Sequence, residues 1–180
     1  MSFNFKQLAI PGLLLIEPKV FEDERGFFME KYKQSDFDKY NIPAFVQDNY
    51  SYSKQGIIRG LHYQLNPHAQ GKLVSVIRGK VWDIAVDMRK DSVCFGKWIG
   101  VELSGENNLS FYIPPGFAHG FSALSSEVFF LYKCTGEYDA ACERGVAWND
   151  PTLAIDWRVT DPQSCDRDKK WPLFRDAEYF

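Results

Sequence analysis

Short apolar runs recur along most of the chain, separated by Gly, Pro, Asn and Asp, and few stretches have the 3.6-residue period of an amphipathic helix. From 80 to 88 two sets of side chains alternate, which is typical of a strand between two environments. The pattern predicts a mainly β protein. The predicted strands are 13–16, 26–31, 45–50, 57–61, 73–77, 80–88, 98–103, 109–113, 117–124 and 128–135.

Helices are expected only at the periphery. Residues 35–40 are the best candidate for a short helix, with Ser35 as its N-cap. We expect residues 161–180 to wrap over the sheet as short helical turns, held down by Trp171 and Phe174. The strand spacing predicts a sandwich or barrel, and residues 1–180 show no repeat or linker, so one domain is expected.

Composition limits the partners and the location. With 180 residues, 45% of them hydrophobic, the chain is long enough for one full-sized core. A formal net charge of -3 gives no bulk attraction to polyanions, so nucleic acid is not an expected partner. The four cysteines form no CxxC pair, which favours reduced thiols in the cytoplasm over disulfides or a zinc site. The apolar run at 13–16 is too short for a signal or membrane-spanning segment.

Residues 56–78 carry the strongest candidate chemistry. Two apolar runs there place Arg59, His62 and Lys72 in or beside strands. Cationic groups aimed from a sheet into a cavity bind anions or stabilise an oxyanion, although a strand histidine is more often a hydrogen-bonded structural residue and a strand-end lysine a solvated one. A metal site is not expected, because it would require all three histidines of the chain, His62, His68 and His119.

Six motifs occur in one order along the chain: RGFFME at 25–30, QDN at 47–49, RGLHYQ at 59–64, QGKL at 70–73, PPGFAHGF at 114–121 and WNDP at 148–151. Any one of them is a weak signal, but six in register are strong. Over about residues 25–172 the series resembles the dTDP-4-dehydrorhamnose 3,5-epimerase family.

The resemblance implies a jelly-roll, cupin-like double-stranded β-helix that forms a homodimer and uses no metal or organic cofactor. The substrate would be dTDP-4-dehydro-6-deoxy-D-glucose, inverted at C3 and C5 to give dTDP-4-dehydro-L-rhamnose for cell-surface polysaccharide. Both carbons flank the C4 ketone, so deprotonation of either gives an enolate. The chemistry needs a base, an electrophile for the oxyanion, and an acid on the opposite face.

The catalytic roles follow from the same resemblance. His62 matches the base, and Asp168 matches the carboxylate that orients it, with Asp166 as the competing candidate. Cys165 stands where the family usually has serine. Lys72 would stabilise the enolate near the C4 oxygen.

Tyr132 matches the proton donor on the opposite face of the sugar, although an aromatic residue in a β core normally only packs. Tyr138 matches the residue that stacks on the thymine ring. The remaining contacts to the nucleotide sugar would be Arg25, Glu30, Gln47, Asn49, Arg59, Lys72, His119, Glu143 and Arg167.

Two of these contacts, Arg25 and Glu30, are expected to reach the site of the neighbouring subunit. Another point concerns Arg59 and His62, which would face opposite sides of an unbroken strand although the family brings both to the ligand. Gly60 is a plausible β-bulge that resets the alternation.

Two alternatives remain open at this stage. A relative that acts at only C3 or C5 would use the same base and acid, because which carbon reacts depends on how the sugar ring sits. A non-catalytic sugar-nucleotide binding module would keep the arginines and the stacking tyrosine without needing a base and an acid.

Overall fold

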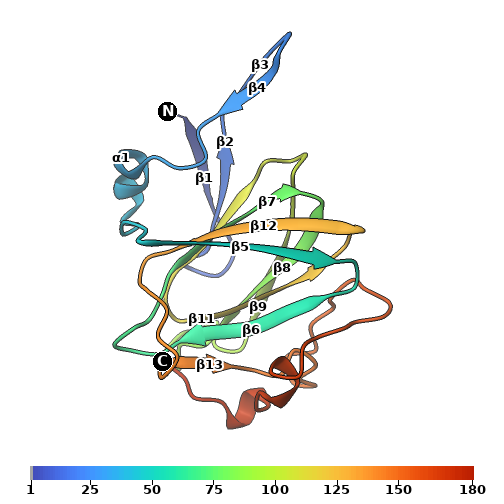
Figure 1. Ribbon diagram of the computed structural model, residues 1–180. Helices are drawn as coiled ribbons and strands as arrows, with labels where there is room; N and C mark the ends of the chain where they lie inside the picture. The colour runs from blue at the N-terminus through green and yellow to red at the C-terminus, as the bar shows by residue number, and fades with distance from the viewer. Residues whose placement is uncertain (1) are drawn as a thin grey trace.

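Two antiparallel sheets pack face to face in the computed structural model, which describes residues 2–180 (Figure 1). From β5 to β8, successive strands alternate between the sheets, as in a jelly roll. The six-stranded sheet has the order β1 (Phe3–Gln7), β2 (Leu14–Pro18), β10 (Ser110–Ile113), β7 (Lys72–Arg78), β12 (Glu127–Cys134), β5 (Gln47–Lys54). The five-stranded sheet has the order β13 (Glu143–Gly145), β6 (Ile58–Gln64), β11 (Phe117–Ala123), β8 (Lys80–Asp87), β9 (Trp98–Ser104).

The main core lies between the two sheets. Phe121 of β11 stacks on Phe130 of β12 with ring centroids 4.3 Å apart, and both rings are buried. Burial of one such side chain stabilises the fold by about 1.5–3 kcal/mol. The pairing joins a strand of one sheet to a strand of the other, so it fixes the spacing of the sheets beside the cavity described below.

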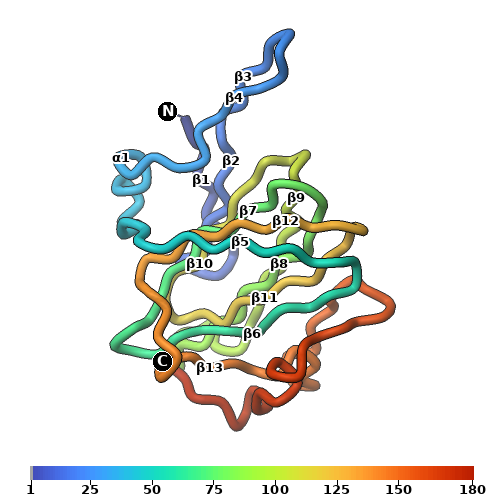
Figure 2. Tube along the Cα trace, viewed as in Figure 1, coloured from blue at the N-terminus to red at the C-terminus, as the bar shows by residue number. Residues whose placement is uncertain are grey.

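The C-terminal tail covers the outer side of the five-stranded sheet (Figure 2). It contains the 3-10 helices η2 (Asp168–Lys170) and η3 (Phe174–Asp176). Phe174 is buried in a second apolar cluster, and its backbone N–H donates to Asp150 at 2.7 Å. The predicted packing of the tail is therefore confirmed. No helix within residues 2–180 is long and apolar enough to cross a membrane.

The predicted helix at 35–40 is present, but its predicted cap is wrong. The α1 helix (Gln34–Phe37) is followed by η1 (Asp38–Tyr40), and the N-cap position belongs to Lys33, which makes no side-chain capping bond. Phe37 is fully buried, with its ring edge-on to those of Phe3 and Tyr32. Tertiary packing of this ring, rather than a local cap, positions the helix.

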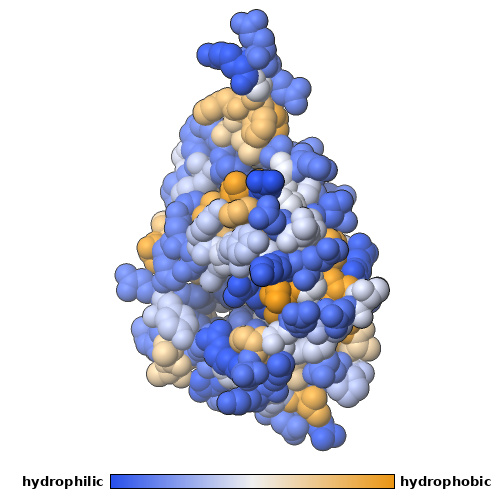
Figure 3. Space-filling model, turned by 45° about the vertical axis from the view of Figure 1, so that its right-hand side comes forward, coloured by the Kyte–Doolittle hydropathy of each residue, from blue (hydrophilic) through white to orange (hydrophobic). Residues whose placement is uncertain are grey.

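A hairpin of β3 (Val20–Asp23) and β4 (Gly26–Met29) projects from the body of the protein (Figure 1). The sequence pattern predicted one strand at 26–31 and missed β3, as well as β1 and β13. Three phenylalanines of the hairpin, Phe21, Phe27 and Phe28, are exposed, Phe28 to 66%. Figure 3 shows hydrophobic residues gathered below the hydrophilic tip of this projection. Exposed aromatic side chains so placed indicate a contact surface.

The predicted bulge at Gly60 is confirmed. In the β6–β11 ladder His62 pairs with His119 and Arg59 with Phe121, so three steps along β6 oppose two steps along β11. The extra residue brings Arg59 and His62 to the same cavity. Gly60 has a φ of 118°, and a Cβ atom there would lie 2.6 Å from the His119 carbonyl oxygen.

We expect Gly60→Ala to lower the free energy of unfolding by about 2 kcal/mol or more, because alanine disfavours this φ and collides with the β11 backbone. Gly136→Ala is the matched control, since its Cβ would meet no atom closer than 3.7 Å. Urea unfolding of both variants measures the difference. Equal stability of the two variants would contradict the bulge geometry.

Candidate active site

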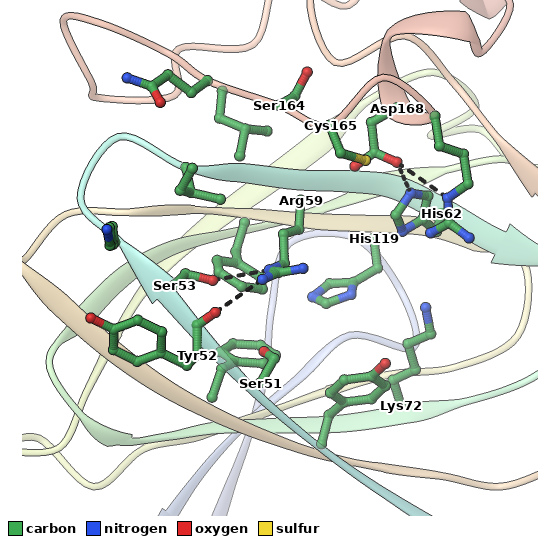
Figure 4. A pocket seen from close by; sticks show the side chains of 18 residues that line it. Ser51, Tyr52, Ser53, Arg59, His62, Lys72, His119, Ser164, Cys165 and Asp168 are labelled. Atoms are coloured by element: carbon green, nitrogen blue, oxygen red, sulfur yellow. Dashed lines mark hydrogen bonds and ion pairs between the residues drawn. The ribbon is translucent and has the colours of Figure 1, made fainter.

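A cavity of about 560 Å³ lies between the sheets, and residues of β5 and β6 form part of its lining. Side chains with acid–base chemistry line it from both sheets: they include His62 on β6 and His119 on β11, and Lys72 on β7 and Tyr132 on β12. Figure 4 shows His62 and His119 pointing into the cavity from one side and Lys72 from the other. A small molecule held here would have functional groups on both of its faces.

His62 and Asp168 form a hydrogen-bonded dyad, with Nε2 2.7 Å from Oδ1 (Figure 4). The other carboxylate oxygen accepts the Gly60 N–H at 3.2 Å. Burial disfavours the charged carboxylate, but the hydrogen bonds from His62 and Gly60 outweigh it and hold the pKa of Asp168 below its usual value. An ionised Asp168 accepts a hydrogen bond from Nε2–H of His62. This leaves Nδ1 of His62 without a proton and able to act as a base.

The competing carboxylate, Asp166, lies elsewhere. Its side chain is 89% exposed and pairs with Lys169 at 3.3 Å, without a contact to His62. Cys165, which replaces the usual serine, lines the cavity beside Asp168 (Figure 4). Geometry therefore selects Asp168 as the partner of the histidine.

Burial shifts the pKa values of Lys72 and Tyr132, the two groups that face His62 from the opposite sheet. It lowers the pKa of Lys72, against the opposing effect of Cys134 and Asp83. It raises the pKa of Tyr132, so the phenol keeps its proton and remains a donor. A cationic or neutral amine and a protonated phenol are both suited to donate to an oxyanion or a carbanion.

Asp83 and His119 form a second buried pair, of which the sequence analysis predicted His119 as a site residue and missed Asp83. His119 Nε2 lies 3.0 Å from both carboxylate oxygens of Asp83, and both residues are buried. Burial raises the pKa of Asp83 and lowers the pKa of His119, moving each toward its uncharged form. The available signal was a carboxylate inside the apolar strand 80–88, where a buried charge requires a partner.

A smaller cavity of about 200 Å³ adjoins the first and shares His62, Lys72, Tyr132 and Arg167 with it. Six predicted nucleotide-sugar contacts line it: Gln47, Asn49, Lys72, Tyr138, Glu143 and Arg167. Glu143 accepts from the Tyr138 hydroxyl at 2.8 Å and pairs with Arg167 at 3.2 Å. Arg59 lies in the larger cavity, where Ser53 and the Tyr52 carbonyl each accept a hydrogen bond from it at 2.9 Å.

Arg25 and Glu30 lie outside both cavities. Arg25 occupies the turn of the projecting hairpin, where its side chain is 84% exposed and pairs with Asp23 at 2.6 Å. Within one chain, therefore, the structure does not bring these two predicted contacts to the site. Residues 2–180 also contain no group of three or more His, Cys, Asp or Glu placed to hold a metal ion.

The family model described as dTDP-4-dehydrorhamnose 3,5-epimerase matches residues 7–176. The chain belongs to the dTDP-4-dehydrorhamnose 3,5-epimerase family. A dTDP-4-dehydrorhamnose 3,5-epimerase of Shigella flexneri is 51% identical over 179 residues, covering 98% of this chain and 99% of the relative. The predicted family and the isomerase class are thus confirmed.

Solved structures of epimerases share the fold. That of the 3,5-epimerase from Legionella pneumophila in complex with dTDP-4-keto-L-rhamnose is 46% identical, with a TM-score of 0.92 over 96% of this chain and 93% of that one. A 3'-monoepimerase from Streptomyces bikiniensis in complex with dTDP-quinovose is 32% identical, with a TM-score of 0.88 over 93% and 86%. The jelly-roll, cupin-like fold predicted for the family is therefore confirmed, and epimerases of both kinds adopt it.

We expect Asp168→Asn to lower the kcat of epimerisation by about 10²- to 10⁴-fold, because an amide neither selects the His62 tautomer nor stabilises the imidazolium. Asp166→Asn is the matched control and should stay within about twofold of the wild type, since Asp166 is a solvated carboxylate. Steady-state kinetics on both variants provide the measurement. A larger loss in Asp166→Asn than in Asp168→Asn would overturn the assignment of the dyad.

Proposed function

We propose that this chain inverts C3 and C5 of dTDP-4-dehydro-6-deoxy-D-glucose to give dTDP-4-dehydro-L-rhamnose. The observation that carries the proposal is the placement of the His62–Asp168 dyad on one side of a cavity and Lys72 on the facing sheet. Family membership of nearly the whole chain supports the same reaction.

His62 is the proposed base. Its Nδ1 removes the proton from a carbon next to the C4 ketone, while Asp168 holds Nε2–H and stabilises the imidazolium that forms. Lys72 donates to the C4 oxygen and stabilises the enolate. Every step is a proton transfer or a hydrogen bond from a side chain of the cavity, which agrees with the prediction of a cofactor-independent reaction.

Tyr132 is the proposed acid. It lies on β12 in the six-stranded sheet, whereas His62 lies on β6 in the five-stranded sheet. A sugar ring between the sheets would present one face to each of them. Reprotonation by Tyr132 then occurs on the face opposite to deprotonation, which inverts the carbon.

The nucleotide end is assigned to the smaller cavity. Tyr138 stacks on thymine, and Gln47 and Asn49 hydrogen-bond the nucleotide. The guanidinium groups of Arg59 and Arg167 bind the pyrophosphate, since their paired donors match its oxygens. Glu143 holds Tyr138 and Arg167 in place, and His119, supported by Asp83, contacts the sugar.

The proposed assembly is a homodimer in which each hairpin reaches the site of the other subunit. Exposure of Phe21, Phe27 and Phe28 supports this arrangement, because a partner would cover them. Arg25 and Glu30 would then complete the nucleotide-sugar contacts. Residues 1–180 form one proposed domain, and the free thiols of all four cysteines favour the cytoplasm.

The deciding experiment is proton NMR of dTDP-4-dehydro-6-deoxy-D-glucose incubated with the protein in D2O. We expect deuterium at both C3 and C5, and no exchange with His62→Ala although that variant still binds dTDP. Exchange at one carbon alone would replace the proposal by a single-carbon epimerase. Binding of dTDP without exchange at either carbon would favour a non-catalytic binding module.

Mixing two site variants, His62→Ala and Arg25→Ala, tests whether the site is shared between subunits. The His62→Ala subunit lacks the proposed base in its own site. The Arg25→Ala subunit keeps that base and lacks only the arginine that would reach the site of the partner. In a mixed dimer one of the two sites has both His62 and Arg25. Random pairing of equal amounts makes half of the dimers mixed, so refolding the variants together should give about a quarter of the wild-type activity. Activity no higher than the average of the two separate variants would exclude sharing of Arg25 between subunits.

A further inference from the structure

The backbone on both sides of Tyr138 is held by one side chain, that of Gln64. Gln64 is the last residue of β6 and is 5% exposed. Its Nε2 donates to the carbonyl of Glu137 at 3.3 Å, and its Oε1 accepts the N–H of Asp139 at 2.8 Å. The two residues next to Tyr138 are thus bonded to the same amide.

The same amide also reaches a second loop. Nε2 of Gln64 donates to the carbonyl of His68 at 2.6 Å, in the connection between β6 and β7. His68 in turn lies 3.5 Å from the Asp139 carboxylate. Gln64 therefore ties the loop that carries Tyr138 both to the sheet and to the neighbouring loop.

A glutamine suits this position because it combines donors and an acceptor in one planar group. Two of its partners are carbonyls and the third is an N–H, so a carboxylate or an apolar side chain leaves backbone groups unpaired. Gln70 makes one further bond of this kind, to the Gly136 carbonyl at 2.6 Å, two residues before Tyr138.

Tyr138 itself is 53% exposed and packs little against the core, so its position depends on hydrogen bonds. The Tyr138 backbone N–H donates a hydrogen bond to Oε1 of Gln47 at 2.8 Å, and the Tyr138 hydroxyl donates one to Oε2 of Glu143 at 2.8 Å. An exposed ring on a fixed backbone is preorganised for stacking, because little conformational entropy is lost when the base binds.

We infer that Gln64 is a positioning residue for nucleotide binding, which holds the Tyr138 loop in the conformation that receives the pyrimidine base. The inference rests on the proposed function, in which Tyr138 stacks on thymine. It assigns Gln64 to substrate affinity rather than to proton transfer, although Gln64 lies only two residues from His62 on the same strand.

The test compares Gln64→Met, Gln64→Glu and Tyr138→Ala with a control, Gln55→Met. Gln55 has a single bond, to the Leu124 carbonyl, in the turn between β5 and β6. Calorimetry with dTDP gives the Kd, steady-state kinetics give kcat and KM, and thermal unfolding checks the fold. Gln64→Glu keeps the acceptor for the Asp139 N–H and is the second variant should Gln64→Met unfold.

Both Gln64 variants should raise the Kd for dTDP and the KM about tenfold while kcat stays within about twofold of the wild type. Gln55→Met should leave all three unchanged. If Tyr138→Ala weakens dTDP binding but folded Gln64 variants bind it as the wild type does, the positioning role is wrong. If Tyr138→Ala leaves the Kd unchanged, the stacking assignment itself fails. A fall in kcat with unchanged Kd would also overturn the inference.

Discussion

The hydrogen bond between His62 and Asp168 is the interaction on which the site depends. It joins strand β6 to the C-terminal tail across 106 positions of sequence. The carboxylate keeps its charge although it is buried, because His62 and the Gly60 N–H both donate to it. One ionised group thus sets the histidine tautomer and anchors the tail.

Other features of the fold serve this contact. Phe174 and its neighbours pack the tail onto the five-stranded sheet, which brings η2 and Asp168 to the histidine. The bulge at Gly60 turns Arg59 toward the same cavity and directs its own N–H to Asp168. Since β6 and β12 belong to facing sheets, the proposed base and the proposed acid are separated by the width of the cavity.

Much of the fold could be predicted from the sequence, because the apolar periodicity of the central strands reports their burial directly. The pattern failed where packing or pairing is nonlocal. The polar strand β5 was placed too early, at 45–50. Its Tyr and Ser residues alternate at the edge of the sheet, so the strand lacks the apolar run by which the other strands were recognised. The Ser35 cap was wrong because burial of Phe37 positions the helix.

The site was predictable only to the extent that motifs encode it. Alternation alone placed Arg59 and His62 on opposite faces, and the bulge hypothesis was needed to reconcile them. Asp83 and Gln64 went unrecognised, since their partners lie 36 or more residues away or on backbone groups that no pattern of side chains reveals. Arg25 and Glu30 depend on a second chain in the proposed dimer, which a single sequence does not describe.

The measurement that tests the central claim most directly is a crystal structure of the His62→Ala protein with dTDP-4-dehydro-6-deoxy-D-glucose bound. The account predicts Lys72 Nζ about 3 Å from the C4 oxygen, with the vacated imidazole position and the Tyr132 hydroxyl on opposite faces of the sugar ring. A sugar bound with both positions on one face, or with its C4 oxygen away from Lys72, would contradict the proposed mechanism.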